Sequence, residues 1–187
     1  HGPEKLKQIS ARINYFTRVI GTSLEKSGYT LYSDNYFDTI RVKCDSTKIL
    51  DLALKEGYNF WKYDDSIGIS LDETVQISDV KAILKIFGAS EVEPSESIPT
   101  ELKRTDSFLN HPVFNSYHSE TEMLRYIHRL ETKDLSLNFS MIPLGSCTMK
   151  LNSVTEMEAV TWPEFSNLHP YAPPDQAQGY YSLFKDL

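Results

Sequence analysis

The segment Ser140–Lys150, which reads SMIPLGSCTMK, holds the densest set of reactive groups in this 187-residue chain. It contains a thiol at Cys147, an amine at Lys150, and hydroxyls that include those of Ser146 and Thr148. Such residue types are typical of a phosphate-binding loop, a thiol nucleophile, a Schiff-base lysine or a loop that donates hydrogen bonds to an anion.

Three of these interpretations depend on features that the sequence does not supply. A Walker-type loop needs a second glycine before its lysine, and here only Gly145 is present. A nucleophilic Cys147 needs a histidine nearby in space, and Lys150 would need a desolvated pocket that its flanking residues do not indicate. The histidines that could serve are His111, His118 and His169.

Two interpretations of the loop remain equal on chemistry alone. In one, the Ser146 and Thr148 hydroxyls and several backbone N–H groups surround an anionic ligand, and Gly145 allows close approach. In the other, the segment is a solvated turn after Pro143. Since no His, Asp and Glu residues recur at metal-ligand spacing, we expect no metal site.

Composition excludes several classes of function. The chain has 19 basic and 26 acidic residues, a net charge of −7, and no basic stripe, so we expect no nucleic-acid partner. No apolar run approaches the ~20 residues of a membrane span, and no secretory leader is visible. Two cysteines, Cys44 and Cys147, favour a reduced, cytosol-like compartment. A start at His1 rather than Met suggests a piece of a longer protein.

The first half of the chain shows alternating helix and strand patterns. Apolar residues at three- and four-residue steps predict helices over 2–28, 45–57 and 74–88. Period-two alternation predicts two strands within 29–44 and two within 58–71. The order α-β-β-α-β-β-α predicts an α+β domain with its helices on one face of an antiparallel sheet.

The second half has less regular patterning. Acids, serines and prolines without apolar periodicity predict a linker at 89–104. Helices are predicted at 119–135 and 154–161, within a largely irregular or helical arm that we expect to lie against another surface. The predicted organisation is therefore a domain at 1–88, a linker at 89–104 and an arm at 105–187.

Long strings of this sequence resemble one enzyme family. RTDSFLNHPVFNSYHSETEMLRYIHRLETKDLSLNFSMIPLGSCTMKLN, followed by WPEF and HPYAPPDQ, closely resembles the P-proteins of the glycine cleavage system, the decarboxylating glycine dehydrogenases. HGPEKL and NYFDTIRV in the first half are similar to that family as well. The departures, such as Lys5 and Asp106, lie outside the loop.

The resemblance implies a fold and a place within it. The family is built from two homologous halves of the pyridoxal-phosphate (PLP) fold type I, which is aspartate-aminotransferase-like. Residues 1–88 would be the small C-terminal domain of the first half. Residues 105–187 would be the N-terminal arm of the second half, truncated before its large PLP domain.

The resemblance also implies a function. The family decarboxylates glycine on PLP and transfers the aminomethyl group to the lipoyl arm of the H-protein. The lysine that attaches PLP would lie outside this chain, so we expect no catalytic residue here and no activity of the isolated chain. Ser146, Cys147 and Thr148 would form a loop beside the cofactor and substrate pocket, which favours the donor-rich interpretation.

The remaining expectations concern partners and location. The resemblance implies glycine, the lipoyl H-protein and the rest of the P-protein as partners, with a homodimeric parent in the cytoplasm, or in mitochondria for a eukaryotic source. The alternative is a non-catalytic interaction module that binds a carrier protein or a partner subunit through the irregular arm.

Overall fold

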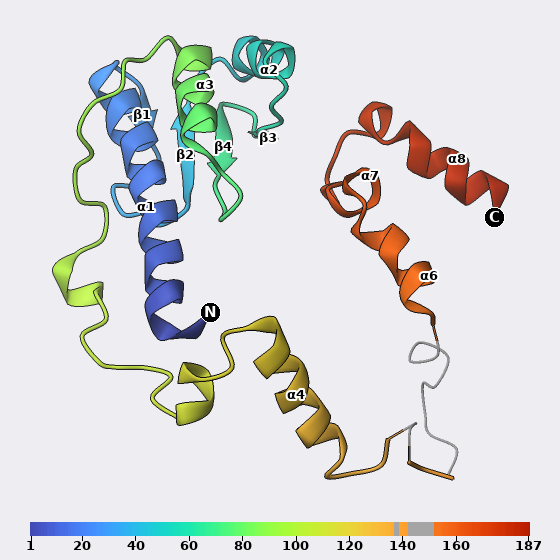
Figure 1. Ribbon diagram of the computed structural model, residues 1–187. Coiled ribbons are helices and arrows are strands. Elements are labelled where there is room, and N and C mark those ends of the chain that lie inside the picture. The colour runs from blue at the N-terminus through green and yellow to red at the C-terminus, as the bar shows by residue number, and fades with distance from the viewer. Residues whose placement is uncertain (137–138, 142–151) are drawn as a thin grey trace. The chain divides into compact units, whose positions relative to one another are not determined.

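The computed structural model describes residues 1–136, 139–141 and 152–187 (Figure 1). These residues form two compact units, His1–Glu120 and Thr121–Leu187, and each is described by itself. The predicted loop residues Ser146, Cys147 and Thr148 lie outside the described residues.

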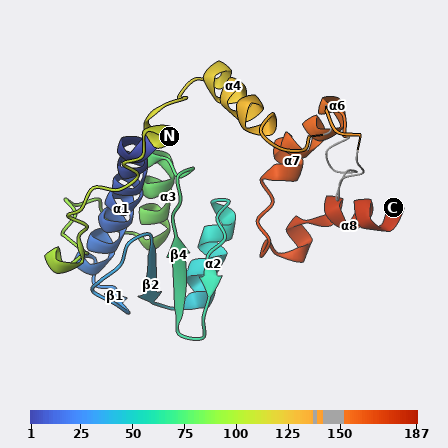
Figure 2. The same cartoon turned by 90° about the horizontal axis from the view of Figure 1, so that it is seen from below.

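The first unit confirms the predicted order α-β-β-α-β-β-α. Its four strands form an antiparallel sheet in the order β1-β2-β4-β3. Helices α1 and α3 lie side by side against this sheet (Figures 1 and 2). The elements are α1 (Gly2–Lys26), β1 (Thr30–Leu31), β2 (Thr39–Lys43), α2 (Ser46–Lys55), β3 (Trp61–Lys62), β4 (Ser66–Ser70) and α3 (Ile77–Phe87). The α+β class is therefore confirmed.

The apolar core lies between the helices and one face of the sheet. Val42 pairs with Ile67, and Ile40 pairs with Ile69, so the period-two alternation points all four side chains inward. The three-to-four-residue stripe of α1 places Ile20 and Leu24 against them. The helix side of the core also includes Val19, Ile49, Ala53, Val80, Ile83, Leu84, Ile86 and Phe87.

Polar contacts at the helix ends fix where α2 and α3 begin and end. The Asp45 carboxylate accepts from the Lys48 N–H at 3.2 Å and caps α2. Gln76 and Asp79 form a reciprocal capping box at the start of α3. Gly88 ends α3 with φ of 66°, a left-handed conformation that favours glycine.

Tyr58 links the end of α2 to the start of α3 and should make stability sensitive to high pH. Its hydroxyl donates to Asp79 Oδ1 at 2.7 Å. Burial first, and then the Asp79 carboxylate, raise the pKa of Tyr58 to about 12 from 10.0. The folded state thus favours the neutral phenol, so this stabilisation is complete below pH 10 and is lost as pH rises to about 12.

We therefore expect Tyr58→Phe to have a lower free energy of unfolding than the parent chain at pH 8. The difference between the two free energies should narrow between pH 10 and 12. Urea denaturation across that range measures the gap. Tyr15→Phe, at an exposed position of α1, is the control and should track the parent chain. A gap that stays constant to pH 12 would contradict the Tyr58–Asp79 assignment.

The segment predicted as a linker lies along α1 (Figure 1). The Val92 N–H donates to Ser23 Oγ and the Ser95 N–H donates to Thr22 Oγ1, each at 3.1 Å. Short 3-10 turns follow at Thr100–Leu102 and Pro112–Asn115. We call residues 89–104 the strap. The division of the chain into a domain, a linker and an arm at residues 88 and 104 stays a prediction.

The second unit contains more helix than the sequence patterns indicated. The two predicted helices are present, the second as α6 continued by a 3-10 turn. Two further helices occupy a stretch that we expected to be irregular, because short helices rich in Pro, Gly and aromatic residues have weak intrinsic propensity. The elements are α4 (Glu120–Glu131), α6 (Val154–Glu158), α7 (Pro163–Ser166) and α8 (Gln178–Asp186).

Aromatic contacts, rather than a core, connect α7 and α8. Neighbouring rings lie about 6 Å apart along the series Trp162, Phe165, Tyr180 and Phe184. The Tyr180 hydroxyl donates to the Phe165 carbonyl at 2.6 Å. Within the described part of Thr121–Leu187 no apolar side chain is buried. The described residues of this unit therefore form no hydrophobic core of their own.

Candidate functional site

The described residues on each side of the predicted loop form defined local structure. Before it, the Ser140 N–H donates to the Ser136 carbonyl at 2.9 Å in a turn. After it, Ser153 and Glu156 form the capping box of α6, with hydrogen bonds of 3.1 and 2.8 Å. The roles predicted for Ser146, Cys147 and Thr148 remain predictions, since those residues lie outside the described ranges.

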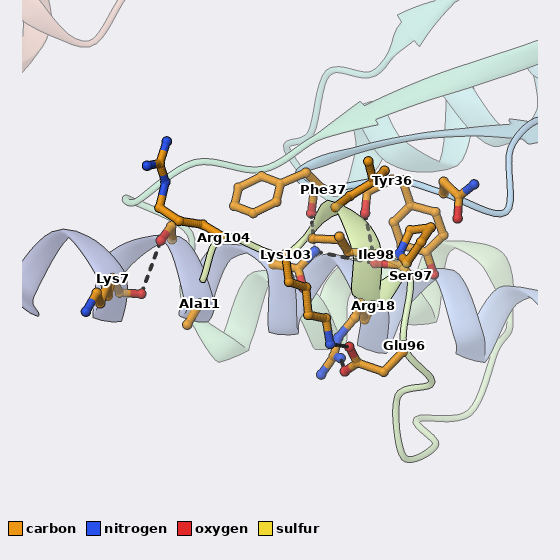
Figure 3. Close-up of a pocket in the computed structure, with 15 residues that line it drawn as sticks. Lys7, Ala11, Arg18, Tyr36, Phe37, Glu96, Ser97, Ile98, Lys103 and Arg104 are labelled. Atoms are coloured by element: carbon orange, nitrogen blue, oxygen red, sulfur yellow. Dashed lines mark hydrogen bonds and ion pairs between the residues drawn. The ribbon is translucent and has the colours of Figure 1, made fainter. Parts of the chain in front are cut away.

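A pocket of about 860 Å³ lies beside α1 in the first unit (Figure 3). One wall is a single face of α1, where lining residues recur at helical spacing. A second wall is the connection between β1 and β2, and a third is the C-terminal part of the strap. The lining residues are Lys7, Ser10, Ala11, Asn14, Arg18, Asn35, Tyr36, Phe37, Glu96, Ser97, Ile98, Pro99, Leu102, Lys103 and Arg104.

An ion-pair cluster closes one side of this pocket. The Glu96 carboxylate contacts both the Arg18 guanidinium and the Lys103 ammonium (Figure 3). The Arg18 side chain is only 16% exposed, so Glu96 supplies the counter-charge that its burial requires. Arg18 Nε is buried without a hydrogen-bond partner among the described residues.

Neutral hydrogen bonds hold the adjoining walls together. Buried Ser97 donates from Oγ to the Tyr36 carbonyl at 2.8 Å. The Asn14 side-chain amide donates to the Phe37 carbonyl at 2.9 Å and to Ser97 Oγ at 3.4 Å. One strap serine and one α1 amide therefore fix the β1–β2 connection against the helix.

The pocket has features of a binding surface rather than of a catalytic centre. Its lining carries four cations and one carboxylate. Two of these cations are paired with carboxylates just outside the pocket, Lys7 with Glu4 and Arg104 with Asp106. Burial raises the pKa of Tyr36, which keeps its phenol neutral at pH 7. Nothing in the described lining supplies an activated nucleophile or base.

His111, His169 and Cys44 have structural roles. His111 and His169 each precede a proline, and each accepts a backbone N–H at Nδ1 at 3.1 Å, from Val113 and Tyr171 respectively. Burial raises the pKa of the Cys44 thiol, so it is not activated. Across the described ranges no three His, Cys, Asp or Glu side chains gather as metal ligands.

Sequence reasoning missed the Arg18–Glu96–Lys103 cluster. Arg18 and Glu96 are 78 positions apart, and both resemble ordinary solvated charges on a helix and in a polar segment. The only sequence signal was local: an arginine on the polar side of a predicted helix and acids in a predicted linker.

We expect Glu96→Ala to loosen the strap. It leaves Arg18 mostly buried without a counter-charge, which should cost about 1–2 kcal/mol, between the values for exposed and buried ion pairs. Urea denaturation measures the loss, and trypsin should cut faster after Lys103 and Arg104. Glu93→Ala, at an exposed strap position, is the matched control. It should change the free energy of unfolding and the rate of trypsin cleavage by little. Equal effects of the two substitutions would contradict the role of Glu96.

Comparisons with known proteins give similarities over the whole chain. Residues 1–87 match the model of the glycine cleavage system P-protein family. The chain is 48% identical over its full length to the glycine dehydrogenase (decarboxylating) of Aliivibrio salmonicida, and 51% identical to that of Thermosynechococcus vestitus. It is 46% identical to a Schizosaccharomyces pombe protein whose name describes a mitochondrial glycine dehydrogenase (decarboxylating).

The chain spans about a fifth of the length of these curated relatives, namely 21%, 20% and 21% of each. No described helix combines the length and apolarity needed to cross a bilayer.

Proposed function

We infer that this chain belongs to the glycine cleavage system P-protein family and acts as part of a longer glycine dehydrogenase that decarboxylates glycine. The observation that carries this proposal is 48–51% identity to bacterial glycine dehydrogenases (decarboxylating) across all of the chain, not only across the 87 residues that the family model matches. Identity of this extent favours the enzyme family over an independent interaction module, which was the alternative.

The cofactor proposed for the longer protein is PLP, in a fold of type I. PLP supplies the electron sink for decarboxylation when it is bound. The described residues do not fit its attachment site, because every lysine among them is exposed, whereas a Schiff-base lysine needs a desolvated pocket. The described lysines are therefore not candidates for attachment, and on the resemblance we assign PLP attachment to a part of the longer protein outside residues 1–187.

Within that protein, we propose two roles for this chain. The first unit supplies a rigid α+β domain, which the strap extends along α1. The loop with Ser146, Cys147 and Thr148 supplies hydrogen-bond donors at the mouth of the substrate pocket. The capped start of α6 at Ser153 supports this role, because it fixes the chain directly after the loop.

The substrates and partners follow from the same proposal. They are glycine, the lipoyl H-protein that receives the aminomethyl group, and the remainder of the P-protein in a homodimer. The organisms of the relatives fit a cytoplasmic protein in bacteria or a mitochondrial one in eukaryotes.

The test of the loop is a double substitution in the full-length protein that contains this chain. Ser146→Ala with Thr148→Ala should lower glycine-dependent exchange of labelled bicarbonate about tenfold or more, since a lost hydrogen bond to a charged group costs about 1.5–3 kcal/mol. Ser166→Ala, in α7, is the hydroxyl control and should leave exchange unchanged.

Unchanged exchange in the double variant would remove the loop from the pocket. Full-length protein that exchanges no bicarbonate at all would contradict the proposed enzyme function. The isolated chain should show no exchange.

A further inference from the structure

A guanidinium lies between two aromatic rings on the sheet face opposite the core. Arg41 is on the central strand β2, and its Cζ is 3.9 Å from the ring centroids of both Tyr32 and Tyr63. Such stacking is favourable because the negative faces of the rings attract the cation. The arrangement fixes three large side chains in one layer over the strands.

Hydrogen bonds lock this layer in place. Arg41 donates from Nε to Ser66 Oγ at 2.8 Å and from Nη2 to Asp65 Oδ1 at 3.3 Å. The Tyr32 hydroxyl donates to Asp65 Oδ2 at 2.5 Å, which lowers the pKa of Asp65 and keeps it ionised. The charges of Arg41 and Asp65 offset each other, and the Lys43 ammonium, 5.0 Å from the Tyr32 ring centroid, adds one positive charge beside the layer.

The layer is exposed although it is built mostly of aromatic residues. Trp61 is 53% exposed, Tyr32 41% and Tyr63 38%. Gly68 stands between Arg41 and Trp61 in the strand register, and a Cβ there would lie 3.3 Å from the Tyr63 ring. The glycine thus leaves room for the rings. We call Tyr32, Arg41, Trp61 and Tyr63 the aromatic layer.

We propose that the aromatic layer is a docking surface for a part of the full-length P-protein that lies outside residues 1–187. This inference rests on the proposed function. The relatives extend for about four-fifths of their length beyond the matched region, so the longer protein has ample chain to cover this face. Its occupant is a surface with apolar groups and hydrogen-bond acceptors.

Composition and rigidity support this assignment. Tyr, Trp and Arg are enriched at binding hot spots, the interface positions where truncation of a side chain to alanine weakens binding most. Side chains held in one conformation before binding lose little entropy on contact. The mixture of rings and polar groups matches contacts between domains of one chain, which are more polar than obligate subunit interfaces.

The experiment compares hydroxyl-radical labelling of the full-length protein with that of the isolated 187-residue chain. Labelling rates at Trp61, Tyr32 and Tyr63 should be about tenfold lower in the full-length protein, because a docked hot spot excludes water. Trp61→Ala in the full-length protein should then raise the Tyr32 and Tyr63 rates toward those of the isolated chain. Leu54→Ala, 57% exposed on α2, is the control and should leave them low.

Three outcomes would overturn the proposal. Equal, high rates in both proteins would show that the layer stays exposed. Equal, low rates in both would mean that the isolated chain or a second copy of it covers the layer; raising the concentration of the isolated chain separates these two cases. Protection that survives Trp61→Ala would show that the layer does not anchor the contact. Bicarbonate exchange is assayed separately, so a loss of the proposed function is distinguishable from a loss of docking.

Discussion

Replacing Leu24 by alanine should lower the free energy of unfolding of this chain by about 2–5 kcal/mol. Leu24 is fully buried on α1, and its side chain packs into the single apolar core of the first unit. The substitution removes buried methyl groups and leaves a cavity that the surrounding helices and sheet can close only in part. Urea denaturation followed by circular dichroism measures the loss.

Leu124→Ala is the matched control because it makes the same chemical change on another helix. Leu124 is 58% exposed on α4, so its removal should change the free energy of unfolding by no more than about 0.5 kcal/mol. Similar losses for the two variants would contradict the assignment of the core to the first unit alone.

The fold of the first unit could be predicted because its patterns are local and agree with one another. Ile40 and Val42 alternate with polar neighbours, and Ile20 and Leu24 recur at helical spacing, so strand and helix faces follow directly from residue order. Local turn and cap residues, such as Asp45, mark the ends of these elements. Periodicity could not predict α8, because Gly179 and paired tyrosines give it a weak helical pattern.

The candidate sites were less predictable because they depend on contacts between distant segments. The pocket joins one face of α1, the β1–β2 connection and the strap, and no local spacing relates Arg18 to Glu96. The aromatic layer was hidden for a different reason: large aromatic residues in a predicted strand look like core residues. The register with Gly68 places Trp61 on the outer face, and stacking on Arg41 places Tyr63 there. Ser146 and Thr148 were indicated by residue type and by resemblance, and the described residues do not test them.

Removal of Thr121–Leu187 should leave the first unit folded with almost unchanged stability. All of the buried apolar residues in the described ranges belong to residues 19–87, and the Phe114 carbonyl and the His118 ring lie beside Gly2 at the start of α1. A chain of residues 1–120 should therefore unfold cooperatively in urea, with a midpoint close to that of the full 187 residues. A chain of residues 121–187 should show no cooperative transition.

The reason is the balance between chain entropy and burial. Ordering each residue costs about 1–2 kcal/mol of backbone entropy, which burial of apolar surface must offset. Among the described residues of the second unit no apolar side chain is buried, and Ile127 is 52% and Phe184 66% exposed, so these helices need another surface to hold them. Circular dichroism and urea titration of the two pieces test this. A cooperative transition of residues 121–187 alone would show a core that the described residues lack, and a large loss of stability in residues 1–120 would show that the arm supports the first unit.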